Sequence, residues 1–230
     1  MPRPIKPITL YGGFLGPNPF KIAIILSELD LPYDSKFIDF ADLKKPSYES
    51  LNPNGRLPTI YDPNTDTTLW ESGAIIEYLI ETYDTEQTLS FTPKSKESHL
   101  ARQWLYFQVS GQGPYYGQAV WFKQYHPERV ESAVQRYVAE ITRVSQVLDK
   151  WLQSREWLVG GKISFADLAF VSWQSAAERF FSAEGYRDDD FPNVKAWLRR
   201  MTERKKVREL IEAQEKVLRE KGPLQAKGGN

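Results

Sequence analysis

The first ninety residues switch between two spacings of hydrophobic and polar positions. Short apolar-rich runs bounded by turn-forming residues predict strands at residues 8–11, 36–40, 59–61 and 67–70. Two sets of apolar residues recur at helical spacing and predict helices, namely Ile22, Ile25, Leu26 and Leu29, then Ile75, Ile76, Leu79 and Ile80. The order is strand, helix, strand, an irregular or short helical stretch, strand, strand and helix. This order predicts an α/β domain with the thioredoxin fold.

The pattern becomes helical throughout after a polar connection over residues 84–93. One long helix is predicted to carry Trp104, Phe107 and Tyr115 on one face, with a kink at Pro114, and residues 130–152 predict another. We therefore predict a thioredoxin-like α/β domain over residues 1–88 and an all-helical domain over residues 94–222.

A third helix start is predicted within the helical region. Ser164 is suited to cap it, Asp167 closes a capping box, and Ile163 precedes them as a hydrophobic staple. We expect loss of Asp167 to damage folding rather than chemistry.

Charge and apolar content exclude several partners. Thirty basic residues balance thirty acidic ones, so no net field draws the protein toward nucleic acid or an anionic membrane. The basic cluster between Arg199 and Arg208 is interleaved with glutamates, which favours a charged helix face over a nucleic-acid site. No run has the length of a secretory signal or a membrane span, so the expected location is the cytoplasm.

Cysteine is absent, which excludes disulfides, thiolate metal sites and catalysis by a protein thiol. His99 and His126 are the only histidines, and no short spacing joins them. We therefore expect no metal site and no Ser/His/Asp triad. Any reactive sulfur must arrive with a ligand.

Two short signatures predict a site for a small charged peptide. Gly55-Arg56-Leu57-Pro58 has the pattern of a turn that enters a strand, where main chain is open to pairing. Glu71-Ser72-Gly73 has the pattern of a helix start, where free backbone N–H groups attract negative charge. One half can pair with a peptide main chain and the other can hold an amino-acid head group, which are the requirements of glutathione.

These motifs carry a family resemblance. Leu57-Pro58, Glu71-Ser72-Gly73 and the segment 164–167 occur in the order and spacing of glutathione transferases, and the resemblance spans roughly residues 7–210. The segments 17–21 and 108–119 resemble the fungal nitrogen-regulator-like class, which is related to bacterial Nu-class disulfide-bond reductases.

The resemblance implies a set of roles for the glutathione-binding residues. Pro58 would be cis, and the main chain of Leu57 would pair with the cysteinyl part of glutathione. Glu71 would face the γ-glutamyl ammonium, and Ser72 would bind the adjoining carboxylate. Glu71 and Ser72 would otherwise only cap a helix. The family also implies a homodimer, in which Arg136 would reach a glutathione bound to the partner subunit.

The glycyl carboxylate of glutathione requires a cation. Arg56 and Lys44 lie in the two loops that would frame it, with Lys45 as a neighbour of Lys44. The two lysines would otherwise form a solvated surface pair.

Ionisation of the thiol must come from hydrogen bonding and the helix dipole. A free thiol titrates near about 8.5, and lowering its pKa by two units requires ~2.7 kcal/mol. One charge-assisted hydrogen bond supplies ~1.5 to 3 kcal/mol and a helix N-terminus ~0.3 to 1. Asn18 is predicted where both meet, as the N-cap of a helix with Pro19 at its first position, and the resembled class assigns thiolate stabilisation to this asparagine. An ordinary N-cap is the alternative, and Tyr11 is the other candidate donor.

An apolar second substrate would require an aromatic cleft. Tyr115 and Trp121 lie six residues apart beyond Pro114 and cannot face the same direction, so at least one is expected to line a cleft or an interface. Phe14 precedes Asn18 and is expected to close the same cleft. Helix-spaced aromatics are otherwise core residues.

The sequence thus predicts a homodimeric glutathione transferase of α/β thioredoxin-like plus all-α architecture. It would use glutathione as co-substrate against electrophiles, peroxides or mixed disulfides, without a metal. The alternative is a weakly active regulatory or scaffold protein with the same fold.

Overall fold

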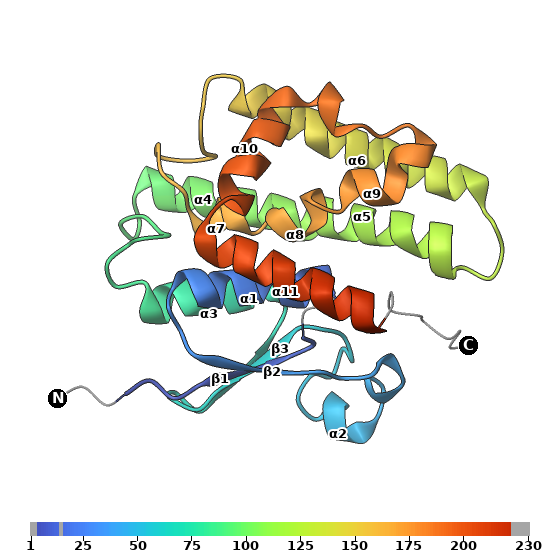
Figure 1. Cartoon of the computed structure of the whole chain (residues 1–230). Helices are drawn as coiled ribbons and strands as arrows, with labels where there is room; N and C mark the ends of the chain where they lie inside the picture. Colours follow the sequence, from blue (N-terminus) through green and yellow to red (C-terminus); the bar gives the residue numbers. More distant parts are fainter. Residues whose placement is uncertain (1–3, 14–15, 222–230) are drawn as a thin grey trace. The chain divides into compact units, whose positions relative to one another are not determined.

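The computed structural model describes residues 4–13 and 16–221 (Figure 1). Contacts within the chain group it into two compact units. Of the described residues, unit 1 combines 4–13, 16–89 and 204–221, and unit 2 contains 90–203. The domain limits predicted from sequence, 1–88 and 94–222, stay a prediction.

Unit 1 has the predicted thioredoxin-like sheet. Its strands are β1 (Ile8–Tyr11), β2 (Tyr33–Lys36), β3 (Thr59–Asp62) and β4 (Thr67–Trp70), in the order β2-β1-β3-β4. β1 pairs with β2 in parallel, while β1 with β3 and β3 with β4 are antiparallel. The parallel pair requires a crossover, which α1 (Pro17–Glu28) supplies.

The second strand was predicted at residues 36–40, but β2 spans Tyr33–Lys36. The register explains the difference, because Ile8 lies opposite Tyr33 and Tyr11 opposite Lys36, so β1 has no residues left to pair with the segment that follows. The apolar residues Phe37 and Phe40 therefore lie outside the sheet. A short 3-10 turn, η1 (Phe40–Asp42), and the helix α2 (Pro46–Glu49) complete the connection to β3.

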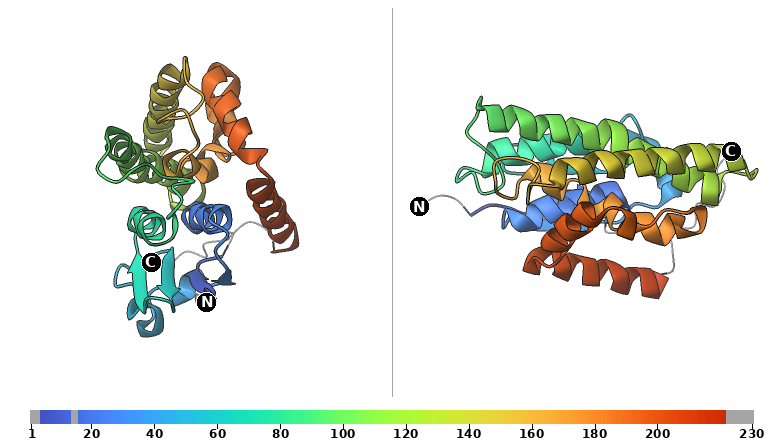
Figure 2. Two further views of the ribbon diagram at one scale, coloured as in Figure 1. Left: turned by 90° about the vertical axis from the view of Figure 1, so that its left-hand side faces the viewer. Right: turned by 90° about the horizontal axis from the view of Figure 1, so that it is seen from above.

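Three helices pack together in unit 1. α1 and α3 (Ser72–Tyr83) cover one face of the sheet (Figure 1), and Figure 2 shows α1 between α3 and α11 (Lys205–Lys221). The apolar side chains of Ile8 and Leu10 on β1 and of Ile22 on α1 are fully buried. This core holds the N-terminal end of α1 against the end of β1.

An ion pair with a buried carboxylate joins Arg204, the residue before α11, to Glu28 at the end of α1. Arg204 donates from Nε and Nη2 to the two carboxylate oxygens of Glu28, at 3.0 and 2.6 Å. Lys206 forms a second ion pair with Asp30, at 2.7 Å. The basic cluster of the C-terminal region therefore makes ion pairs within the protein, as expected of a charged helix face.

Unit 2 is helical, as predicted. Its long helices are α4 (Lys96–Phe107), α5 (Gly113–Val120), α6 (Glu131–Leu152) and α10 (Pro192–Thr202). The short elements are α7 (Phe165–Leu168), α8 (Val171–Gln174), α9 (Ala177–Phe181), η4 (Ser182–Glu184) and η5 (Asp188–Asp190).

The kink predicted at Pro114 takes the form of a π-helical turn. This turn, η2 (Gln108–Gln112), joins α4 to α5, and the N–H of Gly113 donates to the carbonyl of Gln108, five residues back. A second π-helical turn, η3 (Trp121–Tyr125), ends α5. The wider turn lets the helix continue past a proline that cannot donate a backbone hydrogen bond.

The predicted capping box at Ser164 is present. Asp167 is fully buried, and its Oδ2 accepts from the backbone N–H and the hydroxyl of Ser164, at 2.9 and 2.8 Å. Its Oδ1 accepts from the N–H of Leu158 and the indole Nε1 of Trp197, both at 2.9 Å. Burial raises the pKa of Asp167 above its ordinary value, although these four bonds lower it.

Candidate functional site

The turn before β3 presents the main chain of Leu57. The Leu57-Pro58 peptide bond is cis, as the resemblance implied. The carbonyl of Arg56 accepts from the Tyr48 hydroxyl at 2.8 Å and from Nδ2 of Asn52 at 2.7 Å, which fixes the turn from behind. Among the described residues, the main chain of Leu57 makes no backbone hydrogen bond to another segment. It is therefore available to pair with an extended ligand.

Gly55 is required by the same turn. Its φ is +56°, in the left-handed region, and a Cβ there would lie 2.7 Å from the carbonyl oxygen of Leu43 and 2.9 Å from Cδ of Lys44. A side chain would therefore push the Lys44 loop away from the turn.

Glu71 holds an unusual backbone conformation at the start of α3. It occupies the N-cap with φ +70° and ψ 114°, and its exposed side chain makes no capping hydrogen bond. A non-glycine residue in this region costs about 1 to 3 kcal/mol, and such strain gathers at functional sites. The capping alternative therefore does not account for the Glu71 carboxylate. Ser72 follows as the buried first residue of α3, beside the helix N–H groups that lack intrahelical partners.

Lys21 is a buried cation to which no sequence motif assigned a role. It lies on α1 and is fully buried, and burial lowers its pKa to about 7 while the charge of Glu71 acts in the opposite direction. The signal in the sequence was a single cation within the apolar run 20–26, all of which is buried. A buried ammonium within electrostatic range of Glu71 couples α1 to the start of α3.

Asn18 does not occupy the predicted N-cap position. The N-cap is Gly16, with extended φ −103° and ψ 142°, and α1 begins at Pro17. Proline suits the first helical position and favours an extended residue before it, so Pro17 sets the start one residue earlier than Asn18 would. Asn18 is the second helical residue.

This shift changes what the helix start offers. Pro17 and Pro19 have no N–H, and the N–H of Phe20 is bonded to the carbonyl of Gly16 at 3.0 Å. Asn18 therefore supplies the only backbone N–H of the first three helical positions. Its backbone and its side-chain amide are both located where the helix dipole is positive.

Asn18, Arg56 and Leu57 line one pocket of unit 1. Its volume is about 300 Å³, and the rest of its wall is mostly apolar. The three residues come from the start of α1 and the turn before β3, which are far apart in the sequence. The pocket thus joins a side-chain amide, a cation and an open main-chain segment.

The predicted cations differ in their surroundings. The Lys44 amine donates to the carbonyl of Asn54 at 2.8 Å, and Lys45 forms an ion pair with Asp42. The Arg56 side chain is exposed and, within the described part of the chain, has no ion-pair partner. Lys44 keeps two further donors, so it and Arg56 are the available cations of this site.

Tyr11 is the last residue of β1, and its ring packs on Tyr48 of α2. Its ring lies edge-on to Tyr48 with centroids 6.3 Å apart, and the Lys36 amine lies 5.6 Å from its ring centre. Tyr11 is absent from the pocket wall that contains Asn18. This packing favours the structural interpretation of Tyr11.

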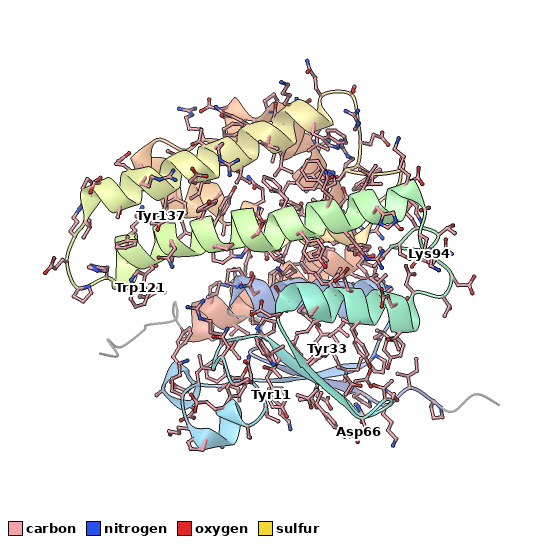
Figure 3. The ribbon with its side chains drawn as sticks, turned by 180° about the vertical axis from the view of Figure 1, so that it is seen from behind. Tyr11, Tyr33, Asp66, Lys94, Trp121 and Tyr137 are labelled. Carbon is pink, nitrogen blue, oxygen red and sulfur yellow. The ribbon has the colours of Figure 1, made fainter. Side chains whose placement is uncertain are left out.

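The aromatic residues proposed for a second substrate pack on other rings of unit 2. The ring centroids of Tyr115 and Tyr137 lie 6.4 Å apart, and those of the exposed Trp121 and of Tyr125 lie 6.2 Å apart. Figure 3 shows Trp121 and Tyr137 at the same end of the α5–α6 pair. Phe14 lies outside the described residues.

Arg136 is exposed on α6 and is already paired. Its Nη1 donates to Oε1 of Glu140 at 2.5 Å, and Arg143 occupies the other oxygen at 2.7 Å. The carboxylate orients Arg136 without burying it, so the guanidinium keeps donors for a further anion.

Two other kinds of site are absent from the described part of the chain. Residues 4–13 and 16–221 hold no group of three or more side chains arranged to bind a metal ion. Over the same ranges, no helix has the length and apolar character needed to cross a bilayer.

Comparison with known proteins gives matches to both halves of the chain. A family model for the N-terminal domain of glutathione S-transferase matches residues 6–81, and one for the C-terminal domain matches residues 83–205. A glutathione S-transferase-like protein of Aspergillus terreus is 53% identical over 218 residues, which cover 91% of this chain and 96% of the relative.

Two solved structures of Ure2-type glutathione transferases from Phanerochaete chrysosporium are similar to it. URE2P8, determined with oxidized glutathione, superposes with a TM-score of 0.88 at 37% identity, covering 95% of this chain and 99% of the other. Ure2p5, cocrystallized with 1-(S-glutathionyl)-2,4-dinitrobenzene, gives a TM-score of 0.85 at 34% identity, with coverage of 95% and 99%.

Proposed function

Because the chain belongs to the glutathione S-transferase family, we propose that it binds glutathione in unit 1 and joins the glutathionyl group, through its thiolate sulfur, to an electrophile. The observation that carries this proposal is the pocket wall shared by Asn18, Arg56 and Leu57. These residues supply a donor for the thiolate, a cation for a carboxylate and a main-chain edge for the peptide. Relatives with the same fold were crystallised with oxidized glutathione and with an aryl conjugate of glutathione, which supports the ligand class.

Binding would use both ends of the tripeptide. The cysteinyl main chain pairs with Leu57, the γ-glutamyl ammonium faces Glu71, and the γ-glutamyl carboxylate takes the hydroxyl of Ser72 and the N–H groups of the α3 start. Arg56 and Lys44 bind the glycyl carboxylate. The strained backbone of Glu71 supports this role, because Glu71 lies at the N-terminus of α3 and its exposed carboxylate makes no capping hydrogen bond.

Ionisation of the thiol rests on Asn18. With one charge-assisted hydrogen bond worth ~1.5 to 3 kcal/mol and a helix dipole worth ~0.3 to 1, the pKa of the bound thiol falls by roughly one to three units. The missing N–H groups of Pro17 and Pro19 leave the amide of Asn18 with the larger share. The thiol proton passes to solvent.

The reaction that follows depends on the second substrate. With a halogenated aromatic, the thiolate electron pair forms a carbon–sulfur bond, and the halide leaves with the electrons of the carbon–halogen bond. With a mixed disulfide of glutathione, the thiolate attacks the glutathione sulfur, oxidized glutathione forms, and the other thiolate leaves and takes a proton. Because the chain has no cysteine, any reduction of this kind passes through glutathione itself.

Two measurements test the proposal: calorimetry of glutathione binding, and turnover assays with a halogenated aromatic, a mixed disulfide of glutathione and a peroxide. Micromolar to millimolar binding of reduced glutathione, with turnover of a halogenated aromatic, supports the transferase. Tighter binding of oxidized than of reduced glutathione, with turnover of the mixed disulfide, favours the reductase branch, and turnover of a peroxide favours the peroxidase branch. Absence of binding to both forms of glutathione would contradict the proposal and favour a regulatory or scaffold role.

We further propose that the active form is a homodimer in which Arg136 of one subunit contacts the glutathione of the other. Its exposed position and its orientation by Glu140 suit such a contact. Light scattering measures the assembly state, and Arg136→Ala should weaken glutathione binding. The matched variant Arg143→Ala removes the other guanidinium on Glu140 and should leave binding unchanged. Equal affinities for all three proteins would contradict the assignment.

A further inference from the structure

Unit 2 carries a second pocket, located where the chain leaves α6 and runs beside α10. Its volume is about 260 Å³, and its wall consists of residues 152–156 together with one face of α10. That face presents Asn193, Ala196 and Arg200, whose spacing of three and four residues brings their side chains to the same side of the helix. Ala196 is exposed and has only a methyl group, so the middle of this face is open. None of these residues lines the pocket that contains Asn18.

Arg155 lines this second pocket and is oriented by an aromatic ring. Its guanidinium carbon lies 4.1 Å from the ring centre of Trp151, and the Trp151 indole N–H donates to the carbonyl of Leu158 at 2.9 Å, which fixes the ring. Nη1 of Arg155 donates to the backbone carbonyl of Trp151 at 2.9 Å. A guanidinium has five N–H donors, so most of them remain available after this bond. Arg155 is therefore oriented by neutral groups, which leave its charge in place.

Arg200 contributes a second guanidinium, which also has neutral partners. Its Nη2 donates to the backbone carbonyl of Glu156 at 2.8 Å, and its guanidinium carbon lies 5.6 Å from the ring centre of Trp157. Its Nε is buried and, among the described residues, has no hydrogen-bond partner. A carbonyl and a ring compensate a half-buried cation only in part, because neither carries a full negative charge. Folding therefore leaves this guanidinium short of partners.

No carboxylate neutralises the two arginines. Neither forms an ion pair within residues 4–13 and 16–221, whereas the neighbouring Arg199 pairs with Glu203 at 3.5 Å. Glu156 is the one carboxylate among the residues that line the pocket, and it is exposed. The nearby Asp149 accepts three hydrogen bonds from the start of α10, which occupy its carboxylate oxygens. Two guanidinium groups against one lining carboxylate leave the wall with an excess of one positive charge.

The donors of this wall suit a phosphate group. A guanidinium binds phosphate through two parallel N–H donors, and two guanidinium groups at one pocket can share its oxygens. The side chains of Gln153 and Ser154 add an amide and a hydroxyl to the same wall. A volume of about 260 Å³ is more than a free phosphate ion requires, so a phosphate ester of a small metabolite also fits.

We propose that the pocket between the end of α6 and α10 binds a phosphate group, free or carried by a small metabolite, through Arg155 and Arg200. This site is independent of the proposed function, because it uses no residue of unit 1 and no glutathione. If the two arginines only held the end of α6 in place, their replacement would lower stability and no phosphate would bind.

Calorimetry with inorganic phosphate and with glucose 6-phosphate, at constant ionic strength, tests the proposal. We expect binding at about millimolar concentration or below. Tighter binding of the ester identifies a phosphorylated metabolite as the occupant, and equal affinities identify the free ion. Arg155→Gln and Arg200→Gln, made separately, should each weaken binding about tenfold or more, the equivalent of one lost charge-assisted hydrogen bond. Glu156→Gln should strengthen binding, because it removes the carboxylate of the wall.

Arg199→Gln is the matched control, because it removes a guanidinium of the same helix that pairs with Glu203 instead. Arg200→Lys keeps the charge but loses the paired donors, so it should retain part of the affinity. Absence of phosphate binding to the unmodified protein would overturn the assignment, as would an equal loss of affinity in Arg199→Gln and in the two pocket variants.

Folding and turnover are checked separately. Circular dichroism shows whether each variant folds, and if Arg200→Gln does not, Arg155→Gln decides the question, because the Arg155 side chain is exposed. Turnover with glutathione should be the same in all of these variants and in the unmodified protein. Failure of phosphate binding with turnover intact refutes this site alone, whereas absence of glutathione binding with phosphate binding intact refutes the proposed function alone.

Discussion

Replacement of Asp167 is expected to remove a large part of the stability of unit 2. In Asp167→Ala, the N–H of Leu158 and the indole N–H of Trp197 lose their acceptor inside the core. Each unsatisfied buried donor costs about 1 to 3 kcal/mol. The Ser164 hydroxyl can turn to another acceptor, but its capping interaction, worth about 1 kcal/mol, is lost.

These terms sum to about 3 to 5 kcal/mol after allowance for the desolvation penalty that the buried carboxylate itself carries. Because burial raises the pKa of Asp167, its ionised form is destabilised by folding, and removing the charge returns part of the loss. Asp167→Asn keeps one acceptor oxygen and should cost less, about 1 to 2 kcal/mol. The order Ala worse than Asn follows from the hydrogen bonds alone.

Urea unfolding followed by tryptophan fluorescence measures the effect, since Trp197 donates directly to Asp167. Asp149→Ala is the matched control. Asp149 also accepts two backbone N–H groups at a helix start, those of Asn193 and Val194, but it is only half-buried. It should cost about 1 kcal/mol. A cost for Asp167→Ala no larger than this would refute the reasoning, as would equal costs for Asp167→Ala and Asp167→Asn.

Other predictions concern unit 1. Arg204→Ala should lower the free energy of unfolding by about 2 to 3 kcal/mol, because the Glu28 carboxylate, 4% exposed, loses its bidentate partner, and adding Glu28→Gln should recover part of the loss in the same urea titration. Lys21→Met should stabilise the protein most below pH 7, because folding lowers the pKa of Lys21 from 10.5 to about 7 and so penalises the charged amine. Between pH 7 and 10.5 the unfolded chain binds more protons, so the unmodified protein gains stability as pH rises, and the advantage of the variant should shrink by roughly 2 to 3 kcal/mol between pH 6 and 9; a constant difference would contradict this. Gly55→Ala should weaken glutathione binding about tenfold by displacing the Lys44 loop, and an unchanged Kd would show that the loop adapts.

Local signals were the part of the structure that sequence could predict. The capping box of Ser164 and Asp167 involves residues three apart, so its pattern identifies it without knowledge of the fold. The apolar stripes of α1 and α3 were predicted for the same reason, and the order of elements then fixed the thioredoxin-like sheet. The cis bond before Pro58 was available only through the family resemblance.

Features that depend on register or on distant partners could not be predicted. The run 37–40 has strand-like composition, and only the pairing of β1 with Tyr33–Lys36 shows that it lies outside the sheet. The ion pair of Arg204 with Glu28 joins residues 176 apart, which no periodicity reports. The predicted start of α1 was wrong because two local signals conflict. Asn18 is a favoured N-cap, whereas Pro17 is favoured at the first helical position, which it occupies.

The central claim is that Asn18 stabilises the thiolate of bound glutathione, and the pKa of that thiol tests it most directly. Titration of the thiolate ultraviolet absorbance of the complex should give a value well below the ~8.5 of a free thiol. Asn18→Ala should raise it by about one to two units, the equivalent of one charge-assisted hydrogen bond, with a parallel loss of kcat. Asn18→Asp, which keeps the shape but opposes an anion, should raise it further. A thiol pKa and a turnover that remain the same in Asn18→Ala would contradict the account.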